Sequence, residues 1–306
     1  MNAVFRKELA DHLASRRFLI LFVLILFAAV FATYIATQNI RSVVTPITEF
    51  IFLNIFTTSG QTQISFLFFL SLFIPIVGIA LGFDAINSER STGNLSRLLS
   101  QPIYRDSVIN GKFLAGLAVL AIMIVSVIAI VAGLGLRIVG VPPSSEETLR
   151  LIVFTVVSLI YGAFWLALSV LFSLLFNRGA TSMLASMALW VFFFFFMTMI
   201  ASSIATARVV YDQDPARWYE IQGMIARISP RTLYEEATMG LLVPELGSLN
   251  LALLVSAIYG GRMVTPLAFS QSLLLVWPQI VSIIALAAIC FAVSYVKFMR
   301  QEIRAV

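Results

Sequence analysis

The chain has 306 residues, of which 60% are hydrophobic and only 11% charged, and its net charge is +5. This composition excludes a soluble enzyme, because one soluble core cannot hide so much apolar surface. It also excludes disorder, since disordered chains are poor in large apolar residues. A single His and a single Cys exclude a zinc cluster, a disulfide framework and any site that needs two imidazoles. The sequence therefore predicts an integral membrane protein.

The first 17 residues predict an amphipathic helix at the membrane surface. Phe5, Leu9 and Leu13 recur at four-residue spacing, and charged residues fill most of the remaining positions. Such a helix lies along the inner leaflet with its basic side toward anionic headgroups. We expect an interfacial helix over residues 1–17. A further role in docking a partner protein, or a role as a topology signal alone, both remain open at this point.

Six apolar stretches are each long enough for a helix that crosses the hydrocarbon core. They are Phe18–Thr37, Ile64–Phe83, Phe113–Leu136, Leu151–Phe176, Ala180–Ala205 and Leu273–Tyr295. Pro75 and Pro278 predict local kinks in the second and sixth spans. Small residues of the fifth span, such as Ser182 and Ser186, predict close helix contact. The predicted fold is an all-α polytopic membrane protein with six transmembrane helices.

The basic residues predict the orientation of these spans. Twelve of them fall on one side, in the N-terminal segment, the loop between spans two and three, the turn between spans four and five, and the C-terminal tail. By the positive-inside rule both termini are cytoplasmic. Because topology accounts for the positive charge, the sequence gives no support for nucleic acid as a partner.

The long outer loop, residues 206–272, contains a further apolar segment at Ala237–Tyr259. Pro244 and Glu245 interrupt this segment, and a seventh span would place the basic C-terminal tail outside. We therefore expect a re-entrant or interfacial hairpin within the loop. The loop also carries six carboxylates and five arginines. These charges allow three readings, which are attraction of a cation, contact with an extracytoplasmic protein, and simple solvation.

Two absences restrict the energy source and the chemistry. The six spans hold no Asp, Glu, Lys, Arg or His, which argues against an ion-coupled transporter. The phosphate-binding pattern G-x-x-x-x-G-K-[ST] is missing, because Gly111-Lys112 is followed by Phe113. Another polypeptide must therefore supply the energy. We assign no catalytic, cofactor-binding or metal-binding residues to this chain, and an intramembrane enzyme has almost no support.

The cytoplasmic loop 84–112 is the most informative stretch of the sequence. Leu95, Leu98 and Leu99 form a short apolar ridge at helical spacing, and Pro102 ends that helix. A polar elbow with an apolar ridge suits docking against a soluble partner protein. The alternative interpretation is a solvated loop.

This loop resembles the signature of ABC transporter permeases of the type-2 exporter family. In that signature an acidic residue ends span two, and Glu-Arg, a Gly, Leu-Leu, a Pro and an Arg follow before Gly-Lys opens span three. The matching positions here are Asp84, Glu89, Arg90, Gly93, Leu98, Leu99, Pro102 and Arg105, followed by Gly111 and Lys112. The segments Phe5–Leu9 and Ile228–Tyr234 also resemble the family, although the outer loop is longer than in its simplest members. Similar subgroups are the permeases linked to sodium efflux and to maturation of the copper site of nitrous-oxide reductase.

The resemblance implies a permease subunit of an ABC exporter in the cell membrane, in contact with membrane lipids. The eight residues from Asp84 to Arg105 would form the ATPase-coupling interface. ATP and Mg²⁺ would be bound by the partner, a pair of cytoplasmic ABC ATPase subunits. A second copy of this chain would complete a two-fold complex, with spans two and five as candidates for the seam, and a related permease could replace that copy. An extracytoplasmic protein is a further possible partner. The rival hypothesis is a membrane scaffold that recruits such a partner without transport.

Overall fold

The computed structural model describes residues 2–43, 50, 52–57, 65–91, 104–140, 142–209, 214–244 and 266–300, which form helices and turns only. Six helical segments in this part of the chain are long and apolar enough to cross a membrane, which confirms the predicted all-α architecture. They are α2 (Arg16–Val43), α4 (Phe66–Gly82), α7 (Arg105–Val139), α8 (Ser145–Leu175), the segment α9–η2–α10 (Gly179–Val191, Phe192–Phe196, Met197–Arg208) and α14 (Phe269–Arg300). The shorter helices are α1 (Asn2–Ala14), α3 (Asn54–Thr57), α5 (Asn87–Ser91), α11 (Pro215–Ala226) and α12 (Pro230–Leu242).

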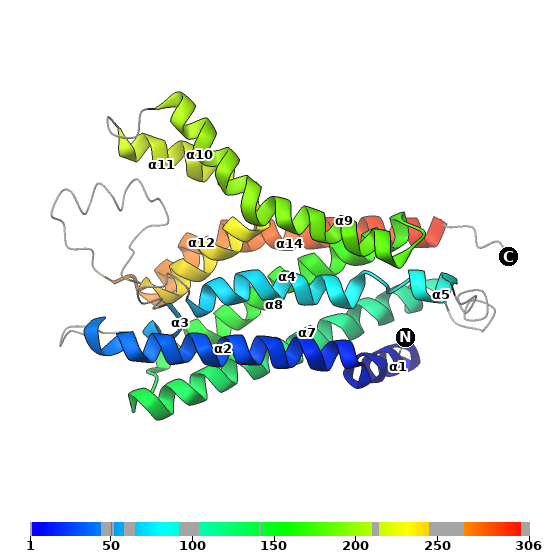
Figure 1. Ribbon diagram of the computed structural model, residues 1–306, viewed down its shortest axis with the longest axis horizontal. Helices are drawn as coiled ribbons and strands as arrows, with labels where there is room; N and C mark the ends of the chain where they lie inside the picture. The colour runs from blue at the N-terminus through cyan, green and yellow to red at the C-terminus, as the bar shows by residue number, and fades with distance from the viewer. Residues whose placement is uncertain are drawn as a thin grey trace.

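The long helices form a bundle with α8 at its centre. Helices α4, α7, α12 and α14 all pack against α8, and its side chains Tyr161 and Trp165 are fully buried. The start of α1, the end of α14 and α5 lie at the same end of the bundle, on the right in Figure 1, which we call the termini end. The opposite end, which carries the α7–α8 turn, is the far end. By contrast α2 is peripheral, because side chains such as Leu19 and Phe27 are exposed along it.

The N-terminal helix ends earlier than the predicted boundary at residue 17. The Ser15 hydroxyl donates to the His12 carbonyl over 2.8 Å and accepts the Phe18 N–H over 3.1 Å. Ser15 thus closes α1 and caps α2, as serine commonly does at a helix start. Arg16 and Arg17 consequently begin the first span and do not belong to α1.

At the far end, local sequence fixes the turn between α7 and α8. Gly140 ends α7 with φ of 75°, a left-handed conformation that glycine adopts without strain. Ser144 then caps α8 and Glu147 completes a capping box. The Glu147 carboxylate also accepts the Phe52 N–H over 2.9 Å, which attaches the short helix α3 to this turn.

The fifth span contains a π-helical turn, η2, in the middle of its apolar run. The small residues Ser182 and Ser186 lie before η2, in α9, and are buried inside the chain's own bundle, where α9 packs against α4 and α8. Beyond η2, helix α10 diverges from the bundle and pairs with α11, so that these two helices project at the upper left of Figure 1. In η2 itself the Phe195 and Phe196 rings are exposed, whereas Phe194 is buried.

Helix α12 returns from the α10–α11 projection to the middle of the bundle. Its Tyr234 ring stacks on Tyr161, midway along α8, with ring centroids 4.3 Å apart. The Tyr234 hydroxyl also forms a 2.9 Å hydrogen bond with Ser158. Helix α12 covers the beginning of the segment Ala237–Tyr259, and residues 245–259 lie outside the described part of the chain. The re-entrant hairpin therefore stays a prediction there.

Candidate coupling site

The predicted coupling elbow is attached to the bundle through a close seam between α4 and α8. A Cβ atom added at Gly78 would lie 3.0 Å from the Gly162 carbonyl oxygen, and one at Gly82 would lie 2.9 Å from the Leu166 carbonyl oxygen. The two backbones therefore approach as closely as small residues permit. The Ser169 hydroxyl adds a hydrogen bond of 3.0 Å to the Ile79 carbonyl. Helices α4 and α8 can transmit a displacement to each other with little slack.

The elbow itself, from the turn after α4 through α5, is fixed by α8 as well. The Ser173 hydroxyl oxygen accepts the N–H groups of Ile86 and Asn87, over 3.0 and 3.2 Å. These two N–H groups belong to the start of α5, where helix donors lack partners within the helix. Ile86 and Asn87 are both buried. The start of α5 is thus a packed part of the protein and differs from the solvated loop that was the alternative interpretation.

A buried ion cluster connects the elbow with two other segments. The Lys112 ammonium lies 2.8 Å from Glu89 Oε1 and 3.0 Å from Glu8 Oε1. The side chains of Lys112, Glu8 and Glu89 are only 6%, 12% and 10% exposed. Because each residue comes from a different helix (α7, α1 and α5), the cluster joins three segments that are far apart in the sequence. We call these three residues the termini-end triad.

Close packing between α1 and α7 stabilises the positions of Glu8 and Lys112 in the triad. A Cβ atom at Gly111 would lie 3.0 Å from Cγ1 of the buried Val4, so the two helices touch at this glycine. Burial alone would raise the pKa of the Glu8 carboxyl, but the neighbouring Lys112 and Lys7 ammonium groups outweigh it and the pKa lies below its usual value. Glu8 is therefore ionised at neutral pH and pairs with Lys112 as a carboxylate.

Two weaker contacts surround the elbow. Arg17 lies 3.7 Å from Asp84, and both side chains are partly exposed, which is a geometry that contributes little free energy. Arg90 donates to the Asn177 side-chain oxygen over 3.0 Å, linking α5 with the α8–α9 turn. In addition, Asp84 lies so close to Gly179 that a Cβ there would be 3.0 Å from its carboxylate.

The structure places four of the eight predicted interface residues. Asp84, Glu89 and Arg90 lie together on the elbow, and Arg105 is the first residue of α7. The other four, Gly93, Leu98, Leu99 and Pro102, lie outside the described residues, so the apolar docking ridge stays a prediction. Sequence reasoning missed the roles of Glu8 and Lys112.

The signal that would have found Glu8 was present in the sequence. Val4, Glu8 and Asp11 follow a helical spacing of their own, beside the apolar stripe of Phe5, Leu9 and Leu13. The apolar stripe was the stronger pattern, yet Leu13 is 40% exposed while Val4 is buried. The partner of Glu8 is distant in sequence, and no local pattern indicates such a pair.

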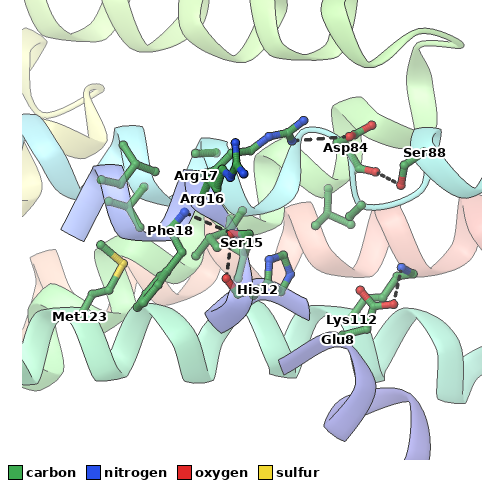
Figure 2. A pocket seen from close by; sticks show the side chains of 17 residues that line it. Glu8, His12, Ser15, Arg16, Arg17, Phe18, Asp84, Ser88, Lys112 and Met123 are labelled. Atoms are coloured by element: carbon green, nitrogen blue, oxygen red, sulfur yellow. Dashed lines mark hydrogen bonds and ion pairs between the residues drawn. The ribbon is translucent and has the colours of Figure 1, made fainter. Parts of the chain in front are cut away.

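A cavity of about 350 Å³ lies beside the triad, between the α1–α2 junction and helices α4, α7 and α8. Figure 2 shows Arg16 and Arg17 on one side of it and Glu8 with Lys112 on another. Met123 lies farther along α7 in the same view. Among the described residues, no three side chains of His, Cys, Asp or Glu are placed to hold a metal ion.

The far end holds a second buried cation, Arg150 of α8, which we call the far-end arginine. Its guanidinium is fully buried and donates to the carbonyl oxygens of Leu241 and Leu267, over 2.8 and 2.6 Å. It also contacts the Ser272 hydroxyl at 3.0 Å and the Glu146 carboxylate at 2.8 Å. One side chain of α8 thus holds both the end of α12 and the start of α14.

A third polar group comes from α12 and reaches the middle of the bundle. Arg231 donates to the Phe194 carbonyl of η2 over 2.7 Å and pairs with Glu235 at 2.7 Å. Glu235 in turn accepts the Ser71 hydroxyl of α4 over 3.0 Å. The six spans carry no charge of their own at this depth, so α12 is the source of the ionisable groups there.

Comparisons with known proteins indicate which proteins this chain is similar to. The sequence profile of the ABC-2 family transporter proteins matches residues 2–303. The chain is also similar to the probable ABC transporter permease protein NosY of Pseudomonas aeruginosa, with 28% identity over 194 residues. The match covers 61% of this chain and 64% of that protein, which is just under two thirds of its length.

Proposed function

Because this chain belongs to the ABC-2 family of transporter proteins, we propose that it is the permease subunit of an exporter driven by two cytoplasmic ATPase subunits. The chain supplies the membrane bundle and the elbow that the ATPases engage. ATP and Mg²⁺ bind to the ATPase partners, and no residue of this chain takes part in hydrolysis. The direction is outward, and both termini face the cytoplasm of the cell that makes the protein.

The observation that carries this proposal is the termini-end triad. A coupling elbow transmits force only if it is held rigidly to the segments it must move. Lys112 holds Glu89 of the elbow and Glu8 of α1 at the same time, at 2.8 and 3.0 Å, and all three side chains are nearly buried. A push on the elbow is therefore shared by α1 and by the start of α7.

The α4–α8 seam provides the path from the elbow into the bundle. The elbow follows directly from α4, and Gly78 and Gly82 bring α4 into backbone contact with α8. Closure of the ATPases on ATP can shift the equilibrium between inward- and outward-facing states only if those states engage the ATPases differently. A rigid α4–α8 pair makes the position of the elbow depend on the state of the bundle.

The experiment compares the ATPase rate of the reconstituted complex with that of its ATPase subunits alone. Glu89→Ala leaves Lys112 bound to Glu8 but removes the tie between the elbow and Lys112, and we expect it to reduce the stimulated rate by about tenfold or more. The matched control is Glu220→Ala, which removes an exposed carboxylate from α11 and should leave the rate unchanged. Wild-type stimulation in a correctly inserted Glu89→Ala protein would refute the coupling role.

We further propose that the complex contains two copies of this chain. Glu235 lies at the depth of the spans, and its side chain is 35% exposed, an expensive arrangement if it faces lipid. A second copy on this face would cover Glu235 together with the exposed Phe195 and Phe196 rings of η2. Closed two-fold symmetry is also the commonest arrangement of soluble oligomers. This face involves spans two and five, the candidates for the seam.

Native mass spectrometry tests the copy number. Two copies of this chain with two ATPase subunits support the proposal, and a stable one-to-one assembly that hydrolyses ATP contradicts it. A mixed pair with a related permease would be recognised by a second permease mass. In a Cys290→Ser background, Phe195→Cys should form a crosslink between copies, whereas Val293→Cys on the exposed side of α14 should not.

The proposed orientation has its own test. In the Cys290→Ser background, Ser145→Cys at the far end should react with membrane-impermeant thiol reagents added outside. Ala10→Cys on α1 should react only after the membrane is opened. Both positions are exposed in the structure, so the reagent's access depends on the side of the membrane alone. The reverse pattern would overturn the orientation.

One observation favours the rival hypothesis of a scaffold. The α10–α11 pair projects from the bundle (Figure 1), and Met224 and Ile228 on this part of the chain are largely exposed. Such a projection suits contact with an extracytoplasmic protein. Stimulation of the ATPase by a transported substrate favours export, whereas assembly with an outer partner that is independent of nucleotide favours the scaffold.

A further inference from the structure

The cavity beside the α1–α2 junction combines charged and apolar walls in a definite order. Its mouth, at the termini end, contains Arg16, Arg17 and Lys112 together with Glu8 and Asp84. Figure 2 shows the two arginines side by side above Ser15, on the opposite side of the cavity from Lys112. With a volume of about 350 Å³, the cavity is large enough for more than a single small ion.

The charges at this mouth are unequally compensated. Lys112 is held by two carboxylates at 2.8 and 3.0 Å, and Arg17 shares Asp84 at 3.7 Å across a partly exposed contact. Arg16 is exposed, and no described carboxylate lies within ion-pair distance of it. Two guanidinium groups thus face one loosely held carboxylate, so the arginine side of the mouth attracts an anion. Guanidinium groups are well suited to phosphate oxygens.

The inner wall of the cavity is apolar. Leu21 of α2, Val77 of α4 and Met123 of α7 line it. A second cavity, of only about 10 Å³, lies deeper between the same three helices and shares Val77 and Met123 with the first. We call the apolar part of the first cavity, which extends from the charged mouth to Val77 and Met123, the apolar slot.

The depth of this slot matches one leaflet of a bilayer. Lys112 and Met123 are eleven residues apart on α7, which corresponds to about 16 Å along the helix. Half of the hydrocarbon core is about 15 Å thick. Helix α2 closes the slot from outside and is itself mostly exposed, with Leu19, Ile20 and Val23 more than half exposed. A ligand could enter from the membrane beside α2.

We propose that this cavity binds an anionic phospholipid from the leaflet nearest the termini. The phosphate of its headgroup lies at Arg16 and Arg17, and the first part of one acyl chain lies in the apolar slot beside Val77 and Met123. A free phosphate ion would satisfy the arginines but leave the slot empty, and a neutral lipid would fill the slot but leave the arginines uncompensated. The proposal does not depend on whether the chain drives export, because it concerns binding to this chain alone.

The consequence of such binding is structural. The lipid would connect the start of α2 with α4 and α7, and it would lie directly beside the termini-end triad. The N-terminal helix and the first span, which otherwise meet the bundle only along one side, would then be held to it by the same ligand. The bound lipid would act as part of the protein's own packing.

The test measures lipid retention by the full-length chain. The protein is purified in detergent, exposed to equal amounts of phosphatidylglycerol, phosphatidylethanolamine or phosphatidylcholine, and examined by native mass spectrometry. We expect one phosphatidylglycerol to be retained at least about tenfold better than either zwitterionic lipid. Inorganic phosphate at the same concentration should neither remain bound nor raise the melting temperature.

Three variants locate the site. Arg16→Gln should reduce phosphatidylglycerol retention several-fold, and Arg16→Gln with Arg17→Gln should reduce it by about tenfold or more. Leu21→Trp fills the apolar slot without changing a charge and should reduce retention of the lipid to a similar extent. The matched control is Arg6→Gln, which removes an exposed charge from α1 outside the cavity and should leave retention within about twofold of wild type.

Several outcomes would overturn the proposal. Equal retention of the three lipids would mean that the arginines do not select the headgroup. Wild-type retention in Leu21→Trp, or binding of inorganic phosphate as tight as that of the lipid, would mean that the slot is not used. If the double arginine variant does not fold, the variants Arg16→Gln and Leu21→Trp decide between these results. Arg16 makes no ion pair among the described residues, and Leu21→Trp changes no charge.

Discussion

The two ends of the bundle each bury a cation, but they use it differently. At the termini end, Lys112 binds two carboxylates, so every contact of the triad joins one side chain with another. At the far end, Arg150 pairs with the Glu146 carboxylate and the Ser272 hydroxyl, but it also donates to the backbone carbonyls of Leu241 and Leu267. A contact to a backbone carbonyl breaks only if the chain itself moves, whereas a pair of side chains is connected to the backbone through rotatable bonds. The comparison indicates that the far end is anchored directly through the backbone and that the termini end is tied together by side-chain ion pairs.

The largest effect should come from the far end. Arg150→Met removes the guanidinium and leaves two buried carbonyl oxygens and a hydroxyl without their donor. We expect a loss of about 3–5 kcal/mol of folding free energy, measured as a large fall in the melting temperature of the detergent-solubilised protein. Arg208→Met, at an exposed position on α10, is the control and should have almost no effect. Equal melting temperatures for the two variants would remove the distinction between the ends.

The termini-end triad should respond to substitution in two separable ways. Lys112→Met removes the ammonium group between Glu8 and Glu89 and leaves only the exposed Lys7 beside Glu8, and we expect a loss of about 3 kcal/mol. Adding Glu8→Gln and Glu89→Gln removes the repulsion and should restore stability to within about 1 kcal/mol of wild type.

Stimulation of the ATPase provides the second readout of the triad. We expect Lys112→Met to abolish the stimulation, and the stable triple variant should not recover it, because the elbow is no longer tied to α1 and α7 by charge. A triple variant with normal stability and normal stimulation would show that the triad serves packing alone.

The seam between α4 and α8 connects the two ends, and Gly82 is its tightest point. A Cβ at this position would be 2.9 Å from both the Leu166 carbonyl oxygen and Ser169 Cβ. We expect Gly82→Ala to cost about 1–3 kcal/mol and to weaken ATPase stimulation. Gly133→Ala on α7 is the matched control, because no atom lies within 4 Å of its added Cβ. There alanine should be neutral or stabilising by about 1 kcal/mol or less. A normal melting temperature for Gly82→Ala would mean that the helices can separate freely.

The smallest effect concerns pH and is confined to the termini end. Burial lowers the pKa of the His12 imidazole below its ordinary value of 6.5, and the Lys112 charge lowers it further. A lowered pKa means that the neutral form favours the folded state, so this contribution is complete above pH 6.5 and is lost as the pH falls below it. The Glu8 carboxylate, whose pKa is also lowered from 4.5, loses its contribution at still lower pH.

The protection factors of the α1 amide groups, which correct for the slower intrinsic exchange at lower pH, should therefore fall between neutral pH and about pH 5, while those of the amides around Arg150 should not change. His12→Gln should remove this fall above about pH 5. An equal fall at both ends would contradict the assignment to α1.

The sequence predicted the fold well because membrane spans depend on a local property. Twenty consecutive apolar residues are sufficient to identify a span, and the six predicted stretches correspond to α2, α4, α7, α8, α9–η2–α10 and α14. The first boundary differed because Ser15, between Ala14 and Arg16, gave a weaker local signal than the paired arginines that follow it. The capping hydrogen bonds of Ser15 are visible only in the structure.

The coupling site could be predicted only in part, because its contacts are long-range. Asp84, Glu89 and Arg90 were found through a resemblance to a family motif. The ion pair between Glu8 and Lys112 joins residues 104 positions apart, and no periodicity indicates such a pair. Nothing in the sequence set Arg150 apart from the other basic residues beside the spans. Burial of an arginine depends on acceptors supplied by distant backbone, which a single sequence does not display.

The polar side chains of α12 have a consequence for how the protein is made. Arg231 donates to the Phe194 carbonyl of η2, and Glu235 accepts the Ser71 hydroxyl of α4. Both of these partners are synthesised before α12. Glu236 instead accepts the side-chain N–H of Gln279 in α14, which is synthesised last. A segment with these charges is too polar to enter the bilayer alone. We expect α12 to remain outside until the first five spans have been inserted, and then to dock against acceptors that are already in place. When α14 leaves the ribosome, its Gln279 would complete the docking of α12. The last steps of assembly would therefore follow the order in which the last two helices are synthesised.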